Sequence, residues 1–412
     1  MFMRKEVIRD VKVNITENPV DAIELAKVIA EAKNIKGNDE SYMIVNVDAM
    51  YDRYLLWKKE LPQIEPFYAV KCNSDETLLS CLAALGIGFD CASREEIDTV
   101  MRLGVEAERI VYANPCKTRS FIVHAEEKGV KKMTFDSKEE LEKIMKLHTN
   151  SELILRIAVS DPTATCPLNL KFGADPVKSA PELLAHAAQM GVNVCGVSFH
   201  VGSGCNDPSA YRTALQHTRS LFNLGQTLGH HMEIVDIGGG FPGGEHHTSF
   251  EQIAALIRSA VDEFFPDPDV RIIAEPGRFF AARPFTLVAN VISKTEVPAE
   301  KITKKACDSS SRGFMYYIND GVYGSFNCIL FDHVHPVGKP LFDEINEEFP
   351  STIWGPTCDS LDMIEDNKMM RQLEVGDWVL YTDMGAYTCS ASTTFNGFQR
   401  PNPLYVMSER VW

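Results

Sequence analysis

The chain has 412 residues, of which 45% are hydrophobic and 24% are charged, and its formal net charge at pH 7 is −16. This length and composition predict an ordinary globular protein of about two to three domains. The acidic charge argues against nucleic acid and anionic membranes as partners and mildly favours cationic small molecules. The eleven cysteines include no C-x-x-C pair and no long apolar stretch is present, so we expect free thiols, no metal and a cytoplasmic protein.

In chain order, two strand-like segments come first, at residues 12–16 and 42–48. From residue 67 onward short apolar runs alternate with helical patterns, which is typical of β/α units. The eight apolar runs lie at 67–70, 87–91, 110–113, 133–135, 153–157, 194–199, 234–237 and 270–274.

Several of the helical segments between these runs have clear start signals. A capping box, in which Ser or Thr is followed three residues later by Glu, is predicted at Ser93 with Glu96, Ser137 with Glu140 and Thr248 with Glu251. Eight β/α units in about 200 residues predict an α/β fold, a closed (β/α)8 TIM-like barrel. A doubly wound open sheet is the alternative.

Beyond Arg278 the sequence changes character. Strand-like runs at 285–297, 314–318, 378–382 and 403–407 are separated by Gly, Pro and Asp clusters. We therefore predict a second, all-β domain, which the N-terminal strands join. The predicted boundaries are 46–281 for the barrel and 1–45 plus 282–412 for a β-sandwich or β-barrel-like domain.

The stretch 67–73, FYAVKCN, carries a lysine, Lys71, at the end of an apolar strand. An ammonium group there loses hydration, and a lysine with a depressed pKa is a nucleophile that forms Schiff bases. A surface lysine at a strand end is the plainer interpretation. Barrel enzymes, however, place their active sites at the carboxyl ends of the strands. Other chemically useful residues lie at this end of the predicted strands. Asp90 nearly ends the second strand and Arg156 lies in the fifth, while His200, the glycine-rich stretch 238–243 and Glu275 to Arg278 follow the sixth, seventh and eighth.

Each of these residues alone has an ordinary structural explanation, as a turn, a satisfied polar group or a structural ion pair. Their grouping on one rim of the predicted barrel favours a functional explanation over these structural ones. A glycine-rich loop with Arg278 nearby suits a phosphate group. A phosphate site, a Schiff-base lysine and a strand-end carboxylate together suit pyridoxal 5′-phosphate (PLP).

Several motifs then resemble one family. They are 67–73, 200–204 (HVGSG), 238–243 (GGGFPG), 275–278 (EPGR), 319–326 (NDGVYGSF), 354–359 (WGPTCD), 385–388 (GAYT) and 396–398 (NGF). In this order they resemble the barrel-type, PLP-dependent basic amino acid decarboxylases, and most closely the eukaryotic ornithine-specific branch. The resemblance covers residues from roughly 40 to the C-terminus.

The resemblance implies roles for residues of the barrel. Lys71 would hold PLP as a Schiff base, His200 would stack on its ring, and Glu275 would pair with the pyridine nitrogen. The cofactor-binding set it implies is Lys71, Asp90, Arg156, His200, Ser203, Gly238, Gly239, Gly240, Glu275, Pro276, Gly277, Arg278 and Tyr387.

The resemblance also assigns residues of the second domain. Cys358 would return a proton to the substrate α-carbon, and Asp332 and Asp359 would bind the distal ammonium group. Phe331 stands where the family often has Tyr, which puts the fine affinity for substrate in doubt. Cys358 and Asp359 would come from the facing subunit of a homodimer.

An ion pair of Lys171 with Asp362 is implied across the same dimer interface. The implied reaction is decarboxylation of L-ornithine to putrescine and CO2 in polyamine biosynthesis. A sister enzyme acting on lysine, arginine or diaminopimelate is one alternative. A silent regulator of the antizyme-inhibitor kind is another, and antizyme itself stays open as a partner, since 117–146 resembles its binding face only loosely.

Overall fold

The computed structural model describes residues 3–8, 11–159, 171–244, 247–342 and 346–412. Contacts within the chain divide it into two compact units. The sheet unit contains Met1–Arg53 and Ala281–Trp412, and the barrel unit contains Tyr54–Phe280.

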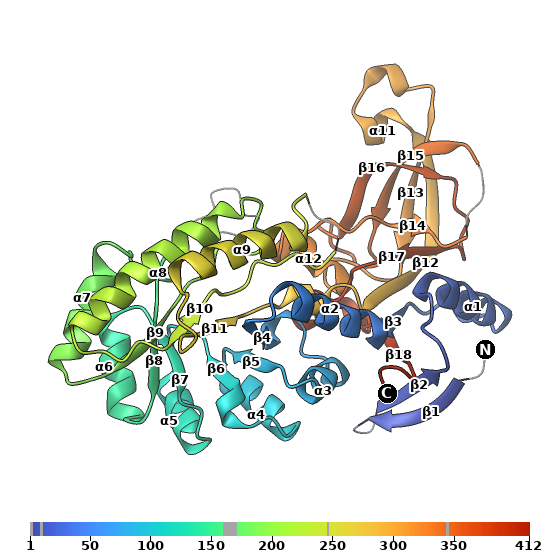
Figure 1. Ribbon diagram of the computed structural model, residues 1–412. Coiled ribbons are helices and arrows are strands. Elements are labelled where there is room, and N and C mark those ends of the chain that lie inside the picture. Colours follow the sequence, from blue (N-terminus) through green and yellow to red (C-terminus); the bar gives the residue numbers. More distant parts are fainter. Residues whose placement is uncertain (1–2, 9–10, 160–170, 245–246, 343–345) are drawn as a thin grey trace. The chain divides into compact units, whose positions relative to one another are not determined.

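The barrel unit contains eight parallel strands that close on themselves, because β11 pairs with β4. The strands are β4 (Ile64–Ala69), β5 (Gly88–Cys91), β6 (Ile110–Tyr112), β7 (Lys132–Phe135), β8 (Glu152–Arg156), β9 (Val194–Ser198), β10 (Ile234–Asp236) and β11 (Arg271–Ala274). The closed barrel confirms the (β/α)8 prediction and excludes the open doubly wound sheet. Figure 1 shows the strands ringed by helices.

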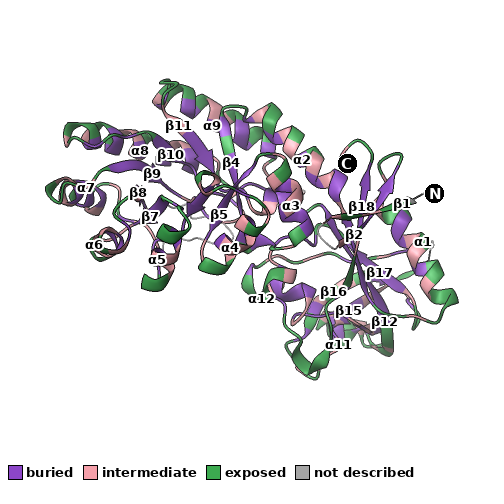
Figure 2. Ribbon diagram, turned by 90° about the horizontal axis from the view of Figure 1, so that it is seen from below, coloured by how far each residue is buried: buried purple, intermediate pink, exposed green. Residues whose placement is uncertain are grey.

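A helix follows each strand of the barrel. The helices are α3 (Glu76–Ala84), α4 (Arg94–Arg102), α5 (Arg119–Glu127), α6 (Lys138–Leu147), α7 (Ser179–Gln189), α8 (Ser209–Thr227), α9 (Phe250–Phe264) and the short α10 (Arg278–Ala281). One further helix, α2 (Val47–Glu60), precedes β4, and short 3-10 turns follow β4 (η1, Val70–Cys72) and precede β6 (η2, Ala107–Arg109). The strands are buried while the outer helix faces are exposed (Figure 2).

The helix starts agree only partly with the predicted capping boxes. Ser93 accepts the backbone N–H of Glu96, as predicted, but the Glu96 side chain instead accepts the N–H of Ala92. The box predicted at Thr248 is wrong by one residue. Ser249 and Gln252 form it, each side chain accepting the other's backbone N–H. Two adjacent hydroxyl residues both suit an N-cap, so spacing alone does not select between them.

The sheet unit is built on one ten-stranded sheet with both parallel and antiparallel pairs. Its strands are β1 (Met3–Ile8), β2 (Val11–Thr16), β3 (Tyr42–Asn46), β12 (Phe285–Pro298), β13 (Arg312–Ile318), β14 (Lys339–Pro340), β15 (Glu348–Trp354), β16 (Met363–Arg371), β17 (Trp378–Tyr381) and β18 (Asn402–Ser408). The N-terminal strands lie within this sheet, since β18 pairs with both β2 and β3.

Helical segments accompany the sheet. They are α1 (Ala22–Ile35), α11 (Glu300–Thr303), α12 (Cys328–Phe331) and the 3-10 turns η3 (Ala306–Asp308), η4 (Ser325–Asn327), η5 (Cys389–Ala391) and η6 (Phe395–Gly397). Helix α1, which the sequence patterns did not predict, buries Leu25, Ala26 and Ala30 against Trp378 and its neighbours. Asp21 caps it by accepting the N–H groups of Ile23 and Glu24.

Candidate active site

Lys71 lies in η1, directly after β4, at the carboxyl rim of the barrel. Its ammonium group forms a close ion pair with Asp90 of β5, whose side chain is 1% exposed, whereas that of Lys71 is 44% exposed. The lysine is therefore held at the rim by a buried carboxylate, and its side chain is partly exposed rather than enclosed by apolar groups.

Glu275, directly after β11, is the second buried carboxylate of the rim. Burial and the neighbouring charge of Asp236 raise its pKa well above the usual range, while Lys71 and Arg156 act in the opposite direction. A buried carboxylate in this state is stabilised by any cation that comes close to it. The site can thus bind a protonated heterocyclic nitrogen.

Asp236, the last residue of β10, is a member of this site that was not identified from the sequence. It is fully buried, one of its oxygens accepts the N–H of Gly238 at 2.9 Å, and burial raises its pKa to about 7. Its position two residues before the glycine triplet was the available signal. A single strand-end aspartate, however, does not reveal from sequence that barrel closure will bury it.

The glycine loop after β10 packs against the loop after β9. At Gly238, with a left-handed φ of 64°, a Cβ atom would lie 2.2 Å from the carbonyl oxygen of Phe199. At Gly240, with φ 108°, it would lie 2.8 Å from the carbonyl oxygen of Gly202. These positions require glycine, because a side chain has no room and the backbone conformation disfavours one. The loop leaves backbone N–H groups available for an anion.

Three further predicted residues lie on this rim. His200 accepts the N–H of Gly202 through Nδ1, and burial, with help from Arg156 and Lys71, holds the His200 pKa well below its usual range, so the ring is neutral. Arg278, at the start of α10, donates to the hydroxyl of Ser203 at 3.4 Å. The barrel unit therefore groups the predicted carboxylates and cations with a candidate phosphate loop.

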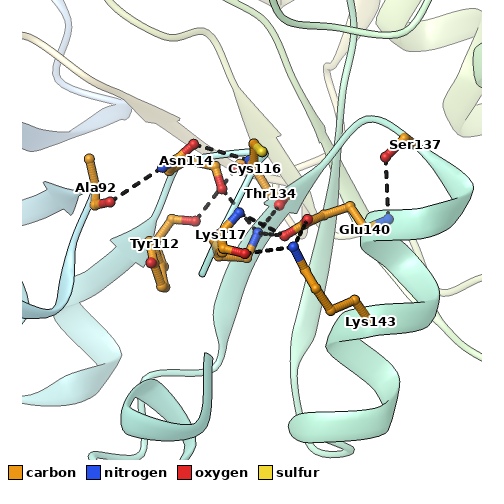
Figure 3. A network of polar contacts seen from close by, with 9 residues as sticks. All are labelled: Ala92, Tyr112, Asn114, Cys116, Lys117, Thr134, Ser137, Glu140 and Lys143. Carbon is orange, nitrogen blue, oxygen red and sulfur yellow. Dashed lines mark hydrogen bonds and ion pairs between the residues drawn. The ribbon is translucent and has the colours of Figure 1, made fainter. Parts of the chain in front are cut away.

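A network of polar contacts around Lys117 stabilises the neighbouring part of the rim (Figure 3). The side chain of Lys117 is fully buried. Its ammonium group lies 3.0 Å from Glu140 and donates to the carbonyl oxygens of Thr134 and Asn114. Burial lowers the Lys117 pKa to about 8. The Asn114 amide in turn donates to the carbonyl of Ala92 at 3.4 Å, two residues after Asp90. The network thus connects the loops that follow β5 and β6 with β7 and α6.

Several predicted residues belong to the sheet unit, where Cys358 and Asp359 share one turn after β15. Cys358 is exposed, and the carboxylate of Asp359 accepts the N–H of Leu361 and a close hydrogen bond from the phenol of Tyr323. These bonds lower the pKa of Asp359, so it is charged at neutral pH.

Other predicted residues of this unit occupy different segments. Asp332, at the end of α12, is 6% exposed and the adjacent Phe331 is 70% exposed. Tyr387 has a left-handed φ of 54°, which is strained for an aromatic residue.

Lys171 and Asp362, which are predicted to pair across a dimer interface, have different surroundings within one chain. Asp362 is 1% exposed, and its carboxylate accepts the N–H groups of Val322 and Thr357 and the Thr357 hydroxyl. The ammonium group of Lys171 lies 4.8 Å from the centre of the Phe172 ring. Their pairing between subunits stays a prediction.

Within the described residues, no group of three or more His, Cys, Asp or Glu side chains is arranged to hold a metal ion. In the same part of the chain, no helix is long and apolar enough to cross a membrane.

Comparisons with known proteins agree with this geometry. Residues 47–282 match the family model described as "Pyridoxal-dependent decarboxylase, pyridoxal binding domain". The chain is 64% identical to ornithine decarboxylase of Caenorhabditis elegans, covering 100% of this chain and 98% of that one. It is 44% identical to antizyme inhibitor 2 of Xenopus laevis, covering 98% and 89%.

Among solved structures, the arginine decarboxylase of Paramecium bursaria Chlorella virus bound to agmatine is similar. Its TM-score is 0.85 at 36% identity, covering 93% of this chain and 100% of that one. The chain therefore belongs to the pyridoxal-dependent decarboxylase family, in the branch that contains the ornithine decarboxylases.

Proposed function

We propose that this chain decarboxylates L-ornithine to putrescine and CO2 with PLP as its cofactor. The observation that carries the proposal is the grouping of Lys71, Asp90 and Glu275 with the glycine loop on one barrel rim. Membership of the ornithine decarboxylase branch supports the choice of substrate.

The residues present fit PLP. The phosphate group would meet the backbone of a loop whose glycines leave no room for a side chain, together with Arg278 and Ser203. The buried pair Glu275 and Asp236 favours a cation beside it, and a protonated pyridine nitrogen is one. When bound, PLP supplies an electron sink for the bonding electrons released as CO2 leaves.

Each residue of the barrel then has a specific task. The amine of Lys71 would carry the cofactor, and Asp90 would hold that amine in place. Glu275 would favour a protonated ring nitrogen, and the neutral ring of His200 would lie against the cofactor without adding charge. The proposed cofactor-binding set is completed by Arg156, Ser203, Gly238, Gly239, Gly240, Pro276, Gly277, Arg278 and Tyr387.

Cys358 would deliver a proton to the α-carbon after CO2 departs, since a thiol can act as a general acid. Asp332 and Asp359 would hold the distal ammonium group, which two carboxylates can desolvate together. Phe331 would line the same end of the substrate without contributing a hydroxyl group.

We further propose a homodimer in which Cys358 and Asp359 of one subunit complete the site of the other, with Lys171 and Asp362 paired at the interface. The barrel and sheet units would be its two domains, with boundaries near residues 46 and 281. A cytoplasmic location is consistent with the cysteines of the described residues, all of which are free.

A silent regulator is the second candidate, because one relative is an antizyme inhibitor. In that case antizyme would be a partner. The deciding experiment is CO2 release by the purified chain with PLP and L-ornithine, L-lysine or L-arginine. We expect turnover that is fastest with ornithine. No CO2 release from any of the three would favour the regulator instead.

A further inference from the structure

The turn that carries Cys358 is contacted by two other segments of the sheet unit, one containing Val322 and one containing Asn396. The turn at 355–362 is fixed from within by Asp362, which accepts the N–H groups of Thr357 and Val322. Asp362 sits so close that a Cβ atom at Gly355 or Gly321 would approach its carboxylate to 2.2 Å. The turn therefore has a defined conformation up to Thr357.

The segment that contains Asn396 contacts the same turn through the side chain of this residue. The side-chain oxygen of Asn396 accepts the backbone N–H of Cys358 at 3.1 Å, although 38 residues separate them. Asn396 has a left-handed φ of 54°, and Gly397 after it also has a positive φ of 82°. Asparagine is one of the few residues with a side chain that adopt this conformation readily.

The segment bearing Asn396 is itself anchored. Thr393 donates its N–H to the carbonyl of Tyr323 at 2.8 Å, and the rings of Tyr323 and Phe395 lie 4.4 Å apart between centres. Tyr323 also donates its phenol to Asp359. Cys358 and Asp359 thus have different direct contacts: the side chain of Asn396 accepts the backbone N–H of Cys358, and the phenol of Tyr323 donates to the carboxylate of Asp359.

We propose that Asn396 is a positioning residue that aims the thiol of Cys358 at the substrate α-carbon. The inference rests on the proposed function, in which the S–H bond of Cys358 breaks, the new C–H bond forms at the α-carbon, and water reprotonates the thiolate. Without Asn396 the Cys358 backbone is free to rotate, and the thiol spends less time in the productive geometry.

A misplaced proton leaves a measurable product. If the cofactor carbon is protonated instead, ornithine and PLP yield pyridoxamine phosphate, 4-aminobutanal and CO2. The cofactor gains two electrons, which the substrate loses. The ratio of 4-aminobutanal to putrescine therefore reports proton placement independently of the overall rate.

The test compares three variants of the holoenzyme. Asn396→Gly keeps the left-handed backbone but removes the acceptor, whereas Asn396→Asp keeps an acceptor oxygen and tolerates the same φ. Asn367→Gly is the matched control, because Asn367 is also left-handed, at φ 49°, but lies in β16.

For Asn396→Gly we expect the aminobutanal fraction to rise about 3- to 10-fold, as the loss of one hydrogen bond allows. We expect KM for ornithine to stay within about twofold, because the Tyr323–Asp359 bond remains. Amide hydrogen exchange in the peptide containing Cys358 should also become faster, with or without cofactor. Asn396→Asp should restore both readouts, and Asn367→Gly should change neither.

Unchanged exchange and unchanged product ratio in Asn396→Gly would overturn the role of Asn396, as would an Asn396→Asp variant no better than Asn396→Gly. Cys358→Ala separates this result from a failure of the proposed function. If Cys358→Ala raises the aminobutanal fraction and Asn396→Gly does not, only the positioning role is wrong. If Cys358→Ala leaves it unchanged, the donor role of Cys358 is wrong as well.

Discussion

The backbone N–H of Glu275 donates to the carbonyl oxygen of Gly238 at 2.7 Å, which joins the strand-end carboxylate to the start of the glycine loop. Asp236 accepts the N–H of the same glycine at 2.9 Å. Any movement of this loop is therefore transmitted to both Glu275 and Asp236.

The first prediction concerns Gly238→Ala. The new Cβ would lie 2.2 Å from the carbonyl of Phe199, so the loop must shift and we expect affinity for PLP to fall by at least about tenfold. Gly86→Ala is the matched control, because Gly86 also has a positive φ, 81°, but a methyl group added there would have no atom within 4 Å. Absorbance titration with PLP measures the affinity. Equal losses in both variants would show that backbone strain, not the clash, is responsible.

The second prediction concerns pH. Burial raises the pKa of Asp236 to about 7, so in the protein without cofactor its folded form holds a proton that the unfolded chain releases above about pH 4. The contribution of Asp236 to stability is present below about pH 4 and is lost as the pH rises towards 7. Asp236→Asn, which keeps an acceptor for Gly238, should remove this dependence.

Thermal unfolding of the cofactor-free protein between pH 5 and 8 checks the Asp236 prediction. Relative to Asp236→Asn, the wild-type Tm should fall as the pH rises. A difference between the two proteins that is constant across this range would contradict the raised pKa.

In the proposed function, Asp332 and Asp359 select the substrate by binding its distal ammonium group. Asp332 is nearly buried and Asp359 is charged, so replacing either with Ala should lower kcat/KM for ornithine by about 30-fold or more, since the ammonium loses a carboxylate partner. Lysine should be at least about tenfold poorer than ornithine in the wild type. Asp269→Ala, in an exposed loop, serves as the control. Lysine or arginine ranking first would assign a sister activity.

Assembly is tested by mixing two variants, each of which lacks one residue of the proposed site, and measuring putrescine formation. If Lys71 and Cys358 of one site come from different subunits, mixing Lys71→Ala with Cys358→Ala should restore up to about a quarter of the native sites, as random pairing of two subunits allows. Activity that stays at the level of the single variants, after subunit exchange has been demonstrated by mass spectrometry, would refute the shared site.

The barrel was predictable because its eight strands are buried on both faces and read as apolar runs. β15 and β16 were missed because they are not continuous apolar runs. In β15 only three consecutive residues are buried, and in β16 the buried residues are separated by exposed ones. The strand predicted at 42–48 ends at Asn46, because Asp48 lies in α2, where its carboxylate accepts the N–H of Ser408.

The residues of the candidate site were likewise predicted only in part. Lys71 and Glu275 were found because each stands out at the end of an apolar run. Asp236 and Asn396 were not assigned roles, because the importance of each depends on a partner brought close only by folding: Gly238 for Asp236, and Cys358 for Asn396. Sequence spacing does not reveal a contact across 38 residues.

Borohydride reduction of the holoenzyme, followed by peptide mapping, shows directly which lysine carries the cofactor. We expect PLP to be fixed to the peptide containing Lys71, and we expect Lys71→Ala to lack both the visible absorption band and nearly all turnover. Lys117, the fully buried lysine of the same rim, is the internal control and should remain unlabelled. Labelling of Lys117, or of any lysine other than Lys71, would refute the assignment of Lys71.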